Sequence, residues 1–546
     1  MKIQTDFLII GSGAAGLSFA LKVADFGSVA LVTKKGIMDS NTVHAQGGVA
    51  SVFGKLDSFD LHIQDTLLSG DGLCNREVVE VVVKNGPDRI RELMDYGVQF
   101  NLSEKTPEKE ASQALDLGRE GGHSQKRIVH AQDMTGKEIE TVLVTHVNNH
   151  KQIALYDNHI AIDLITCSTR MTRGLITTTH EDTCCGAYVL DVATNQVKTF
   201  CAKITLLATG GAGKVYLYTS NPDVATGDGI AMGYRAGATV ANLEFVQFHP
   251  TCLYHPEAKN FLISEVVRGE GGVLVDSQGN PFMNKYDPRE DLACRDVVAR
   301  AIDNELKKSG DDSVFLDISH KDSDFIKRRF PNLSDKCLSF GLHMDKEPIP
   351  VVPAAHYMCG GIATDIFGRT DIQRLYAIGE TACTGLHGAN RLASNSLIEA
   401  FVYAHTAAKQ AVKDLQTLEF DAALDPPLWD EVGTTDSDEG IMVSHNWDEI
   451  RRLMWNYVGI VRSNKRLDRA KRRIEIIQRE ILDYYWGFKV SSDLIELRNI
   501  ATVAELIIKC ARYRKETRGL HYNIEYPERD DRRWKKDTVL RRPFLG

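Results

Sequence analysis

A set of polar side chains that can hold a small dicarboxylate stands in apolar or glycine-rich surroundings between positions 243 and 391. The set is Gln247, His249, Ser264, Glu265, Arg268, Arg295, His356 and Arg391. An arginine guanidinium matches a carboxylate through two parallel hydrogen bonds, and a histidine adds a further donor. Two histidines and two arginines in glycine-rich or proline-flanked loops therefore indicate capture of a dicarboxylate.

Each of these residues alone also has a purely structural explanation. A buried histidine is more often a hydrogen-bonded core residue than a ligand. Glu265 and Arg268 have the spacing of an ordinary helical ion pair, and Arg295 with Asp296 would make a surface pair. The acids and histidines lack the close spacing of metal ligands, so no metal site is expected.

A glycine-rich turn near the N-terminus predicts a dinucleotide site. An apolar strand pattern at 6–10 leads into Gly11-Ser12-Gly13-Ala14-Ala15-Gly16, and a helical pattern at 17–26 and a strand at 28–33 complete a βαβ unit. Gly11 permits the tight turn, Gly13 lets the backbone approach a pyrophosphate, and Gly16 lets the helix pack on the strand. A tight turn without a ligand is the alternative, which the complete βαβ context disfavours.

The acidic residue that holds a ribose hydroxyl in NAD-binding units is missing. It should stand about 20 positions after the glycines, where this chain has Thr33-Lys34-Lys35. A plain NAD site is therefore disfavoured, and the glycines alone do not say which dinucleotide binds.

Two further strand patterns, at 204–209 and 374–378, also end in glycines. The second is followed by Gly379-Glu380, which would present a carboxylate to sugar-like hydroxyls. Glu380 as a surface turn acid is the alternative. Strand ends of this kind, dispersed over the chain, predict a doubly wound parallel sheet that another domain interrupts.

We therefore predict an α/β fold in which a Rossmann-like domain, residues 1–242 and 356–420, is interrupted by an α+β capping domain at 243–355. Residues 421–440 have the composition of a linker. A C-terminal helical bundle is predicted for 441–546, because apolar residues recur there at spacings of three and four: Leu467, Ala470, Ile474, Ile477 and Ile481.

Composition limits the partners and the compartment. The 546 residues are enough for about three or four domains, and a net charge of −9 disfavours nucleic acid as a partner. No apolar run approaches the roughly 18 residues of a membrane span, and no signal peptide is evident. Eleven scattered cysteines without a Cys-x-x-Cys pair indicate reduced thiols in a cytoplasmic protein.

Six longer motifs follow one another along the chain. They are Asn41-Thr42-Val43-His44-Ala45-Gln46-Gly47-Gly48, Arg119-Glu120-Gly121-Gly122-His123-Ser124, Thr226-Gly227-Asp228-Gly229, Gln247-Phe248-His249-Pro250-Thr251, His356-Tyr357-Met358-Cys359-Gly360-Gly361 and His387-Gly388-Ala389-Asn390-Arg391-Leu392-Ala393-Ser394-Asn395-Ser396-Leu397. In this order they resemble the FAD-dependent flavoproteins of the succinate dehydrogenase and fumarate reductase superfamily. The resemblance covers nearly the whole chain, and within the superfamily it is strongest to the L-aspartate oxidases.

The resemblance implies that the interrupted domain binds FAD. It places Gly11, Ser12, Gly13, Ala14, Ala15 and Gly16 at the pyrophosphate, Lys34 near the adenosine, Asn41, Thr42, Val43, His44, Ala45, Gln46, Gly47, Gly48 and Asp228 along the cofactor, Glu380 on the ribitol or ribose hydroxyls, and Ser396 and Leu397 by the isoalloxazine ring. Respiratory relatives carry a histidine before the threonine that matches Thr42. Because Asn41 stands there, the FAD is expected to be non-covalent.

The resemblance also implies roles around the substrate. Glu120 matches the acid that faces the substrate's amino group, and the two carboxylates are held by Gln247, His249, Ser264, His356, Arg391 and Ser394. Arg295 matches the proton donor in fumarate reduction, with Glu265 and Arg268 as the relay behind it.

The implied reaction is oxidation of L-aspartate to iminoaspartate by hydride transfer to flavin N5, with oxygen or fumarate reoxidising the flavin. It begins NAD biosynthesis, so transient contact with quinolinate synthase is implied as well. The main alternative is a fumarate reductase or succinate dehydrogenase flavoprotein subunit, which Asn41 and Glu120 disfavour. A flavin-binding scaffold without turnover is another, and the intact set of histidines and arginines disfavours it.

Overall fold

The computed structural model describes residues 1–103, 115–132, 134–172, 175–177, 182–258, 261–418, 426–432, 434–435 and 440–542. The predicted linker at 421–440 lies in large part outside the described residues. The domain boundaries proposed above stay predictions.

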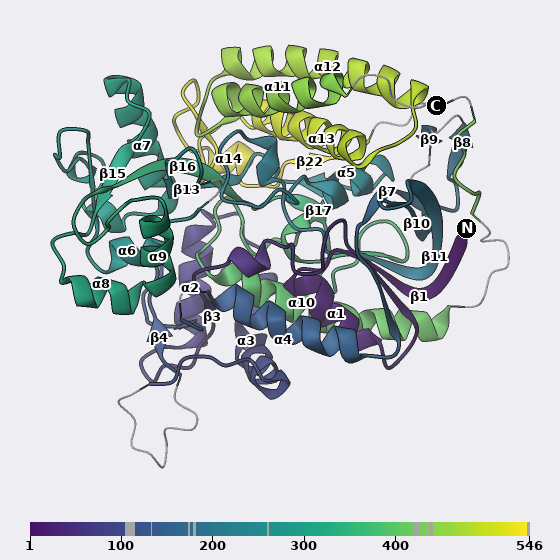
Figure 1. The fold of residues 1–546 in the computed structure, drawn as a ribbon, viewed down its shortest axis with the longest axis horizontal. Coiled ribbons are helices and arrows are strands. Elements are labelled where there is room, and N and C mark those ends of the chain that lie inside the picture. Colours follow the sequence, from purple (N-terminus) through teal and green to yellow (C-terminus); the bar gives the residue numbers. More distant parts are fainter. Residues whose placement is uncertain are drawn as a thin grey trace.

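A seven-stranded sheet forms the centre of the molecule (Figure 1). Its order is β6 (Ile153–Tyr156), β2 (Val29–Val32), β1 (Lys2–Ile10), β11 (Gln196–Leu207), β10 (Cys184–Asp191) and β7 (His159–Thr166), with β18 (Leu375–Ala377) pairing on β11. The neighbours β6, β2, β1 and β11 pair in parallel, and so do β11 and β18. Strand β10 pairs antiparallel with both β11 and β7. The four predicted strands are confirmed in the parallel part. The antiparallel extension was not predicted.

Helices cover both faces of this sheet, which confirms the α/β fold class. Successive side chains of a strand point to opposite faces, so Phe7 and Ile9 join one apolar core and Leu8 and Ile10 the other. The first core contains α1 (Ala14–Val23), α3 (Arg76–Tyr96), α4 (Thr135–Asn149) and α10 (Asn395–Thr417). The second contains α5 (Asp228–Arg235) and the C-terminal helices.

A second sheet lies beside the first, on the left of Figure 1, and is wholly antiparallel. Its order is β13 (Val246–Leu253), β16 (Ile349–Met358), β15 (Val314–Asp317) and β14 (Val273–Val275). It packs with α6 (Glu265–Gly269), α7 (Arg295–Ser309), α8 (Ser323–Arg329) and α9 (Pro331–Ser339). Buried apolar side chains from Leu253 to Val351 form a core of their own here. The strands β13 and β16 run back from this core toward the central sheet.

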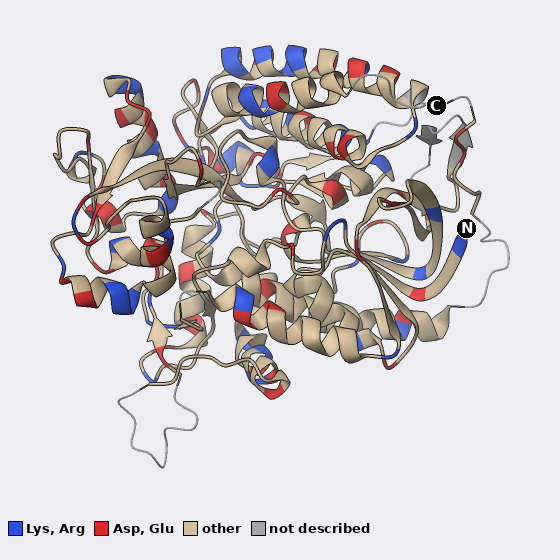
Figure 2. Cartoon of the chain, viewed as in Figure 1, with Lys and Arg blue, Asp and Glu red and all other residues tan. Residues whose placement is uncertain are grey.

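The C-terminal segment folds into α11 (Ile441–Val458), α12 (Asn464–Gly487) and α13 (Ser492–Tyr513). The apolar residues that predicted α12 are all buried, while Lys and Arg gather along its outer face (Figure 2). The helices share one core with the central sheet. In the part of the chain that is described, no helix combines the length and apolar character needed to cross a membrane.

The last strand, β22 (Val539–Leu540), returns to the middle of the chain. It pairs with β12 (Val240–Ala241), which pairs in turn with β17 (Gly361–Ala363), and β19 (Ala382–Cys383) completes this small sheet. Further elements are α2 (Phe59–Ser69), α14 (Asp531–Trp534), β3 (Val49–Ala50), β4 (Leu117–Gly118), β5 (Ile128–Val129), β8 (Arg170–Thr172), β9 (Leu175–Thr177), β20 (Val461–Arg462) and β21 (Tyr522–Asn523).

A buried ion network fixes this C-terminal segment to the loop before β13. Arg514 donates to Glu244 at 2.7 Å and to Glu516 at 2.8 Å, and Arg518 donates to Glu516 at 2.6 Å. All four side chains are at most 1% exposed. Removing one member of such a network leaves its partners' charges uncompensated.

We expect Glu516→Gln to lower the free energy of unfolding by about 3–5 kcal/mol, because it removes the carboxylate that two buried guanidinium groups share and leaves Arg514 with Glu244 alone and Arg518 with Asp531 alone. Glu80→Gln serves as the control, since Glu80 pairs with the exposed Arg76 and Lys84 and such pairs contribute about 1 kcal/mol or less. Urea unfolding of both variants measures the difference. Equal losses would contradict a structural role for the network.

Candidate active site

One cavity runs from the glycine-rich turn to the arginines of the second sheet. Residues at or just beyond the ends of β1, β2, β11 and β18 line it, together with the two segments that follow Ser40 and Arg391. Nearly all the predicted cofactor and substrate residues line this cavity. The exceptions are Gly16, Val43, Gln247 and Arg268, which lie behind its wall.

The glycine-rich turn has the geometry of a phosphate cradle. Gly11 has a φ of +114°, and a Cβ there would lie 2.2 Å from the carbonyl oxygen of Ala208. A Cβ on Gly16 would lie 2.0 Å from the carbonyl oxygen of Gly11, so both glycines are sterically required. Gly13 begins α1 without a side-chain cap, and the nearest atom to a Cβ there would be Thr42 Oγ1 at 3.4 Å. An uncapped helix N-terminus beside an open cavity fits a pyrophosphate.

Lys34 occupies the place where an acid is missing, and two acids hold it. Its Nζ donates to Asp228 at 2.9 Å, to Glu496 at 2.7 Å and to Thr226 at 2.5 Å. Burial lowers the pKa of Lys34, but the charges of Asp228 and Glu496 outweigh this and raise it. Lys34 is therefore a fixed cation in the cavity wall. Glu496 comes from α13 and was not predicted.

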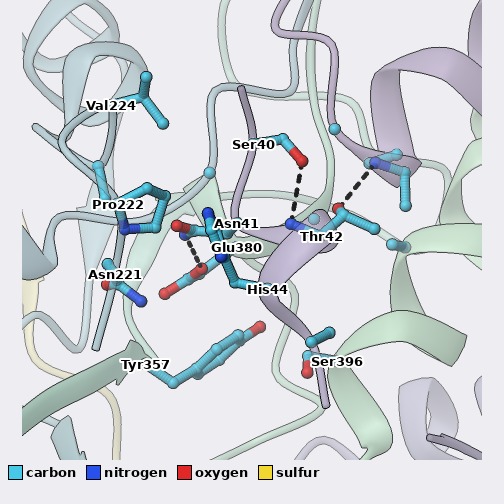
Figure 3. Close-up of a pocket in the computed structure, with 18 of the residues that line it drawn as sticks. Ser40, Asn41, Thr42, His44, Asn221, Pro222, Val224, Tyr357, Glu380 and Ser396 are labelled. Carbon is cyan, nitrogen blue, oxygen red and sulfur yellow. Dashed lines mark hydrogen bonds between the residues drawn. The ribbon is translucent and has the colours of Figure 1, made fainter. Parts of the chain in front are cut away.

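Glu380 and Asn41 present polar atoms to the middle of the cavity (Figure 3). Glu380 accepts hydrogen bonds from Asn41 Nδ2 at 3.3 Å and from the backbone N–H of Met358 at 3.0 Å. Burial raises the pKa of Glu380 to about 7. The buried Oδ1 of Asn41 has no hydrogen-bond partner among the residues that the structure describes. A carboxyl group and a free amide oxygen side by side fit the hydroxyls of a ribityl chain.

The carbonyl oxygen of the Gln247 side chain bridges two arginines at the far end of the cavity. Arg391 donates to it from Nε at 3.2 Å and Nη2 at 2.9 Å, and Arg295 donates from Nη1 at 3.1 Å. The Arg391 guanidinium also stacks over the Tyr357 ring at 4.5 Å. Two buried cations held this close form a site for a dianionic ligand.

His249 and His356 lie between these arginines, with their ring centroids 5.3 Å apart. Burial lowers the pKa of both well below the usual value, and the charges of Arg295 and Arg391 lower it further, so both rings are neutral. His249 Nδ1 accepts a hydrogen bond from the backbone N–H of Thr251 at 3.2 Å, which places the proton on Nε2. Within the described part of the chain, that buried Nε2 has no hydrogen-bond partner, so it can donate to a carboxylate.

Glu265 connects the proposed proton relay. It accepts from Arg295 Nε at 2.5 Å and lies 3.4 Å from Arg268. Burial raises the pKa of Glu265, but the charges of Arg295 and Arg268 outweigh this and bring it down to about 2. Arg268 is 2% exposed and faces the cavity only through Glu265.

Glu120 is an acid on the cavity wall that a serine, rather than an arginine, contacts. Ser394 donates to it at 2.6 Å, and the backbone N–H of Gly48 donates to Ser394 at 3.3 Å. Burial raises the pKa of Glu120, against the charge of Arg295. A Cβ on Gly47 would lie 2.5 Å from its carboxylate, so the glycine makes room for the acid. Ser264 lines the same region and caps α6 through the backbone N–H of Val266.

The sequence did not single out several partners of these groups. Ser220 lies 2.7 Å from His356 Nδ1, Asn390 accepts from Gln247 at 2.8 Å, and Asn499 donates to Asp228 at 2.9 Å. Asn390 and Tyr357 belong to the sequence motifs listed above, so those motifs could have identified them as site residues. Ser220 and Asn499 belong to none of these motifs.

Known protein families, related proteins and a solved structure match this chain over nearly its whole length. The sequence family described as "FAD binding domain" matches residues 6–397, and the family described as "Fumarate reductase flavoprotein C-term" matches residues 447–543. The L-aspartate oxidase of Pseudomonas aeruginosa is 51% identical over 100% of this chain and 99% of that protein, and the L-aspartate oxidase of Yersinia pestis is 51% identical over 96% of each. A solved structure titled "Quinol-Fumarate Reductase with Menaquinol Molecules" has a TM-score of 0.87 and 30% identity, covering 99% of this chain and 96% of that one.

Gly211→Ala should weaken FAD binding about tenfold or more, because the new methyl group would lie 2.1 Å from Glu380 Oε1 and would displace a charged hydrogen-bonding group. Gly440→Ala is the control, since a Cβ there would meet no atom of the described residues within 4 Å. Titration of the apoprotein with FAD gives both dissociation constants. An unchanged constant for Gly211→Ala would remove Glu380 from the cofactor site.

Proposed function

We propose that this chain oxidises L-aspartate to iminoaspartate, the first step of NAD biosynthesis. It belongs to the L-aspartate oxidase family of FAD-binding flavoproteins. The observation that carries this proposal is the pairing of a dicarboxylate site with one separate acid, Glu120, in the same cavity. L-Aspartate differs from succinate by an ammonium group, and Glu120 is the acid available to pair with it.

FAD, when bound, accepts the two electrons of the Cα–H bond as a hydride at N5 and passes them to oxygen or fumarate. The residues of this chain bind, orient and protect the substrate. We assign one carboxylate to Arg391 and His356 and the other to His249 Nε2, with Ser264 as a further donor, while the Ser394 hydroxyl beside them donates to Glu120. Gln247 keeps the two guanidinium groups in place through its single carbonyl oxygen.

Glu120 receives the ammonium group and so fixes the orientation of Cα. Its carboxylate is buried and accepts from Ser394, so an ammonium in contact with it forms a charge-assisted hydrogen bond with little competition from water. The charge of the ammonium lowers the pKa of Glu120 and keeps it ionised.

Arg295 would deliver a proton when fumarate takes the place of L-aspartate. It lines the cavity and is hydrogen-bonded to Glu265, which Arg268 supports on the other side. A proton that leaves Arg295 in a concerted step is replaced through Glu265. The ion pairs of Glu265 with Arg268 and with Arg295 keep the three groups in the order that this replacement needs.

The product suggests where the enzyme acts. Iminoaspartate hydrolyses in water, so the enzyme that consumes it must receive it quickly, and we propose transient contact with quinolinate synthase in the cytoplasm. The alternative as a respiratory fumarate reductase subunit is less well supported, because that resemblance is at 30% identity against 51% for L-aspartate oxidases.

Anaerobic mixing of the FAD-loaded protein with L-aspartate, and separately with succinate, tests the proposal. We expect L-aspartate, and not succinate, to bleach the oxidised flavin band. Bleaching by succinate alone would assign the protein to the fumarate reductase branch, and bleaching by neither would leave a scaffold without turnover.

We expect Glu120→Gln to lower kcat/KM for L-aspartate about 10- to 100-fold, as the loss of one charged hydrogen bond predicts, and to leave fumarate reduction in place. Glu257→Gln, at an exposed acid of the second domain, controls for the change in net charge. Steady-state kinetics with each substrate measures the effect. Equal losses with both substrates would argue against a role at the amino group.

The two substrates should also differ in pH dependence. Because burial raises the pKa of Glu120, the acid is protonated at a higher pH than an exposed glutamate and cannot then accept the ammonium. Hence kcat/KM for L-aspartate should fall about tenfold per pH unit below that pKa, whereas fumarate reduction should lack this acidic limb. Identical acidic limbs in the two pH profiles would contradict the assignment.

A further inference from the structure

Two cysteine thiols touch at the far edge of the central sheet, outside the cavity. The Sγ atoms of Cys167 and Cys185 are 3.3 Å apart, and neither residue lines the site described above. Cys167 directly follows β7, and Cys185 belongs to β10, the neighbouring strand.

A β-bulge brings the thiols together. Cys184 is opposite Thr166 and Gly186 is opposite Ile165, so Cys185 is the extra residue between two paired positions. A bulge turns the side chain of the extra residue away from its usual direction, here toward the chain that leaves β7.

Hydrogen bonds hold the backbone on both sides of the pair. The backbone N–H of Cys167 donates to the carbonyl oxygen of Thr183 at 2.9 Å. The Asp182 carboxylate accepts from the backbone N–H of Ser168 at 3.0 Å and of Thr183 at 2.7 Å. The contact between the thiols is therefore set by fixed backbone, and small side-chain rotations suffice to bring two sulfurs from 3.3 Å to bonding distance.

The two thiols differ in access to solvent. Cys167 is exposed, whereas Cys185 is 5% exposed and burial raises its pKa. An oxidant arriving from solution meets Cys167 first, with Cys185 behind it as a second thiol within reach. Reversible oxidation sites have this arrangement of an accessible and a resolving cysteine.

We propose that Cys167 and Cys185 form an oxidation site that hydrogen peroxide converts to a disulfide. The Cys167 sulfur attacks one peroxide oxygen, so an S–O bond forms, the O–O bond breaks and one water leaves. The Cys185 sulfur then attacks the Cys167 sulfur, an S–S bond forms, and the S–O bond breaks with release of a second water. Two thiols are oxidised and one peroxide is reduced, which balances the electrons.

The source of the oxidant rests on the proposed function. Oxygen that takes up two electrons and two protons from the oxidation of L-aspartate becomes hydrogen peroxide, so turnover with oxygen releases the oxidant into the solution around the protein. Turnover with fumarate gives succinate and no peroxide. The acceptor in use therefore determines whether the thiol pair is oxidised.

The test has two arms on the FAD-loaded full chain. In the first, hydrogen peroxide is added directly, and blocking of free thiols with N-ethylmaleimide is followed by peptide mass spectrometry. We expect a Cys167–Cys185 cross-linked peptide that has lost two hydrogens and returns to two thiols with a reductant. In Cys185→Ser, Cys167 should accumulate as a sulfenic acid that dimedone traps. Cys201→Ser, at a half-buried thiol on β11, should keep the cross-link.

The second arm replaces added peroxide with L-aspartate and oxygen, with and without catalase, and compares it with L-aspartate and fumarate under anaerobic conditions. The cross-link should appear only with oxygen and should be lost with catalase. If added peroxide leaves both thiols free, or links Cys167 to another cysteine, the thiol pair is not an oxidation site. If added peroxide forms the cross-link and L-aspartate with oxygen does not, the pair stands and the proposed source of peroxide fails.

Discussion

The burial of three arginines around a single glutamate is the interaction on which the rest of this structure depends. Arg268, Arg295 and Arg391 are taken out of water, and Glu265 is the acid in direct contact with two of them. Desolvating unpaired charge is costly, so this part of the molecule gains most when a ligand brings carboxylates. That excess of positive charge adds to burial in lowering the pKa of His249 and His356, and the Gln247 carbonyl oxygen accepts from two of the guanidinium groups.

The residues of this charged set come from elements that belong to separate cores of the fold. Gln247 and His249 lie on β13 and His356 on β16, strands that lead out of the second sheet, whereas Arg391 and Ser394 precede α10 in the first core. Helix α13 also takes part in the cavity wall, because its Glu496 pairs with Lys34 and its Asn499 donates to Asp228. The C-terminal helices are thus part of the cofactor wall as well as a packing layer, which is consistent with the single core they share with the sheet.

Local patterns in the sequence predicted the turns, strand ends and helix spacing that depend on nearby residues. The glycines at 11, 13 and 16, the strand ends and the spacing in α12 depend on neighbours a few positions away, and the structure has all of them. The antiparallel pairing of β10 with β7 and of β22 with β12 depends on partners distant in the chain, and no periodicity encodes it. The same limit explains Glu496, which meets Lys34 across 462 positions, and Arg462, a charged side chain that is fully buried against Glu244 and His521.

The pairing of β22 with β12 has a consequence for how the protein is synthesised. A ribosome adds about 5–20 residues per second, so the glycine-rich turn emerges long before Glu496 of α13 and the strand that pairs with β12. Until those last segments are released, Lys34 lacks one of its two acids and the small sheet lacks its edge. The cofactor cradle is therefore complete only after these C-terminal segments have left the ribosome.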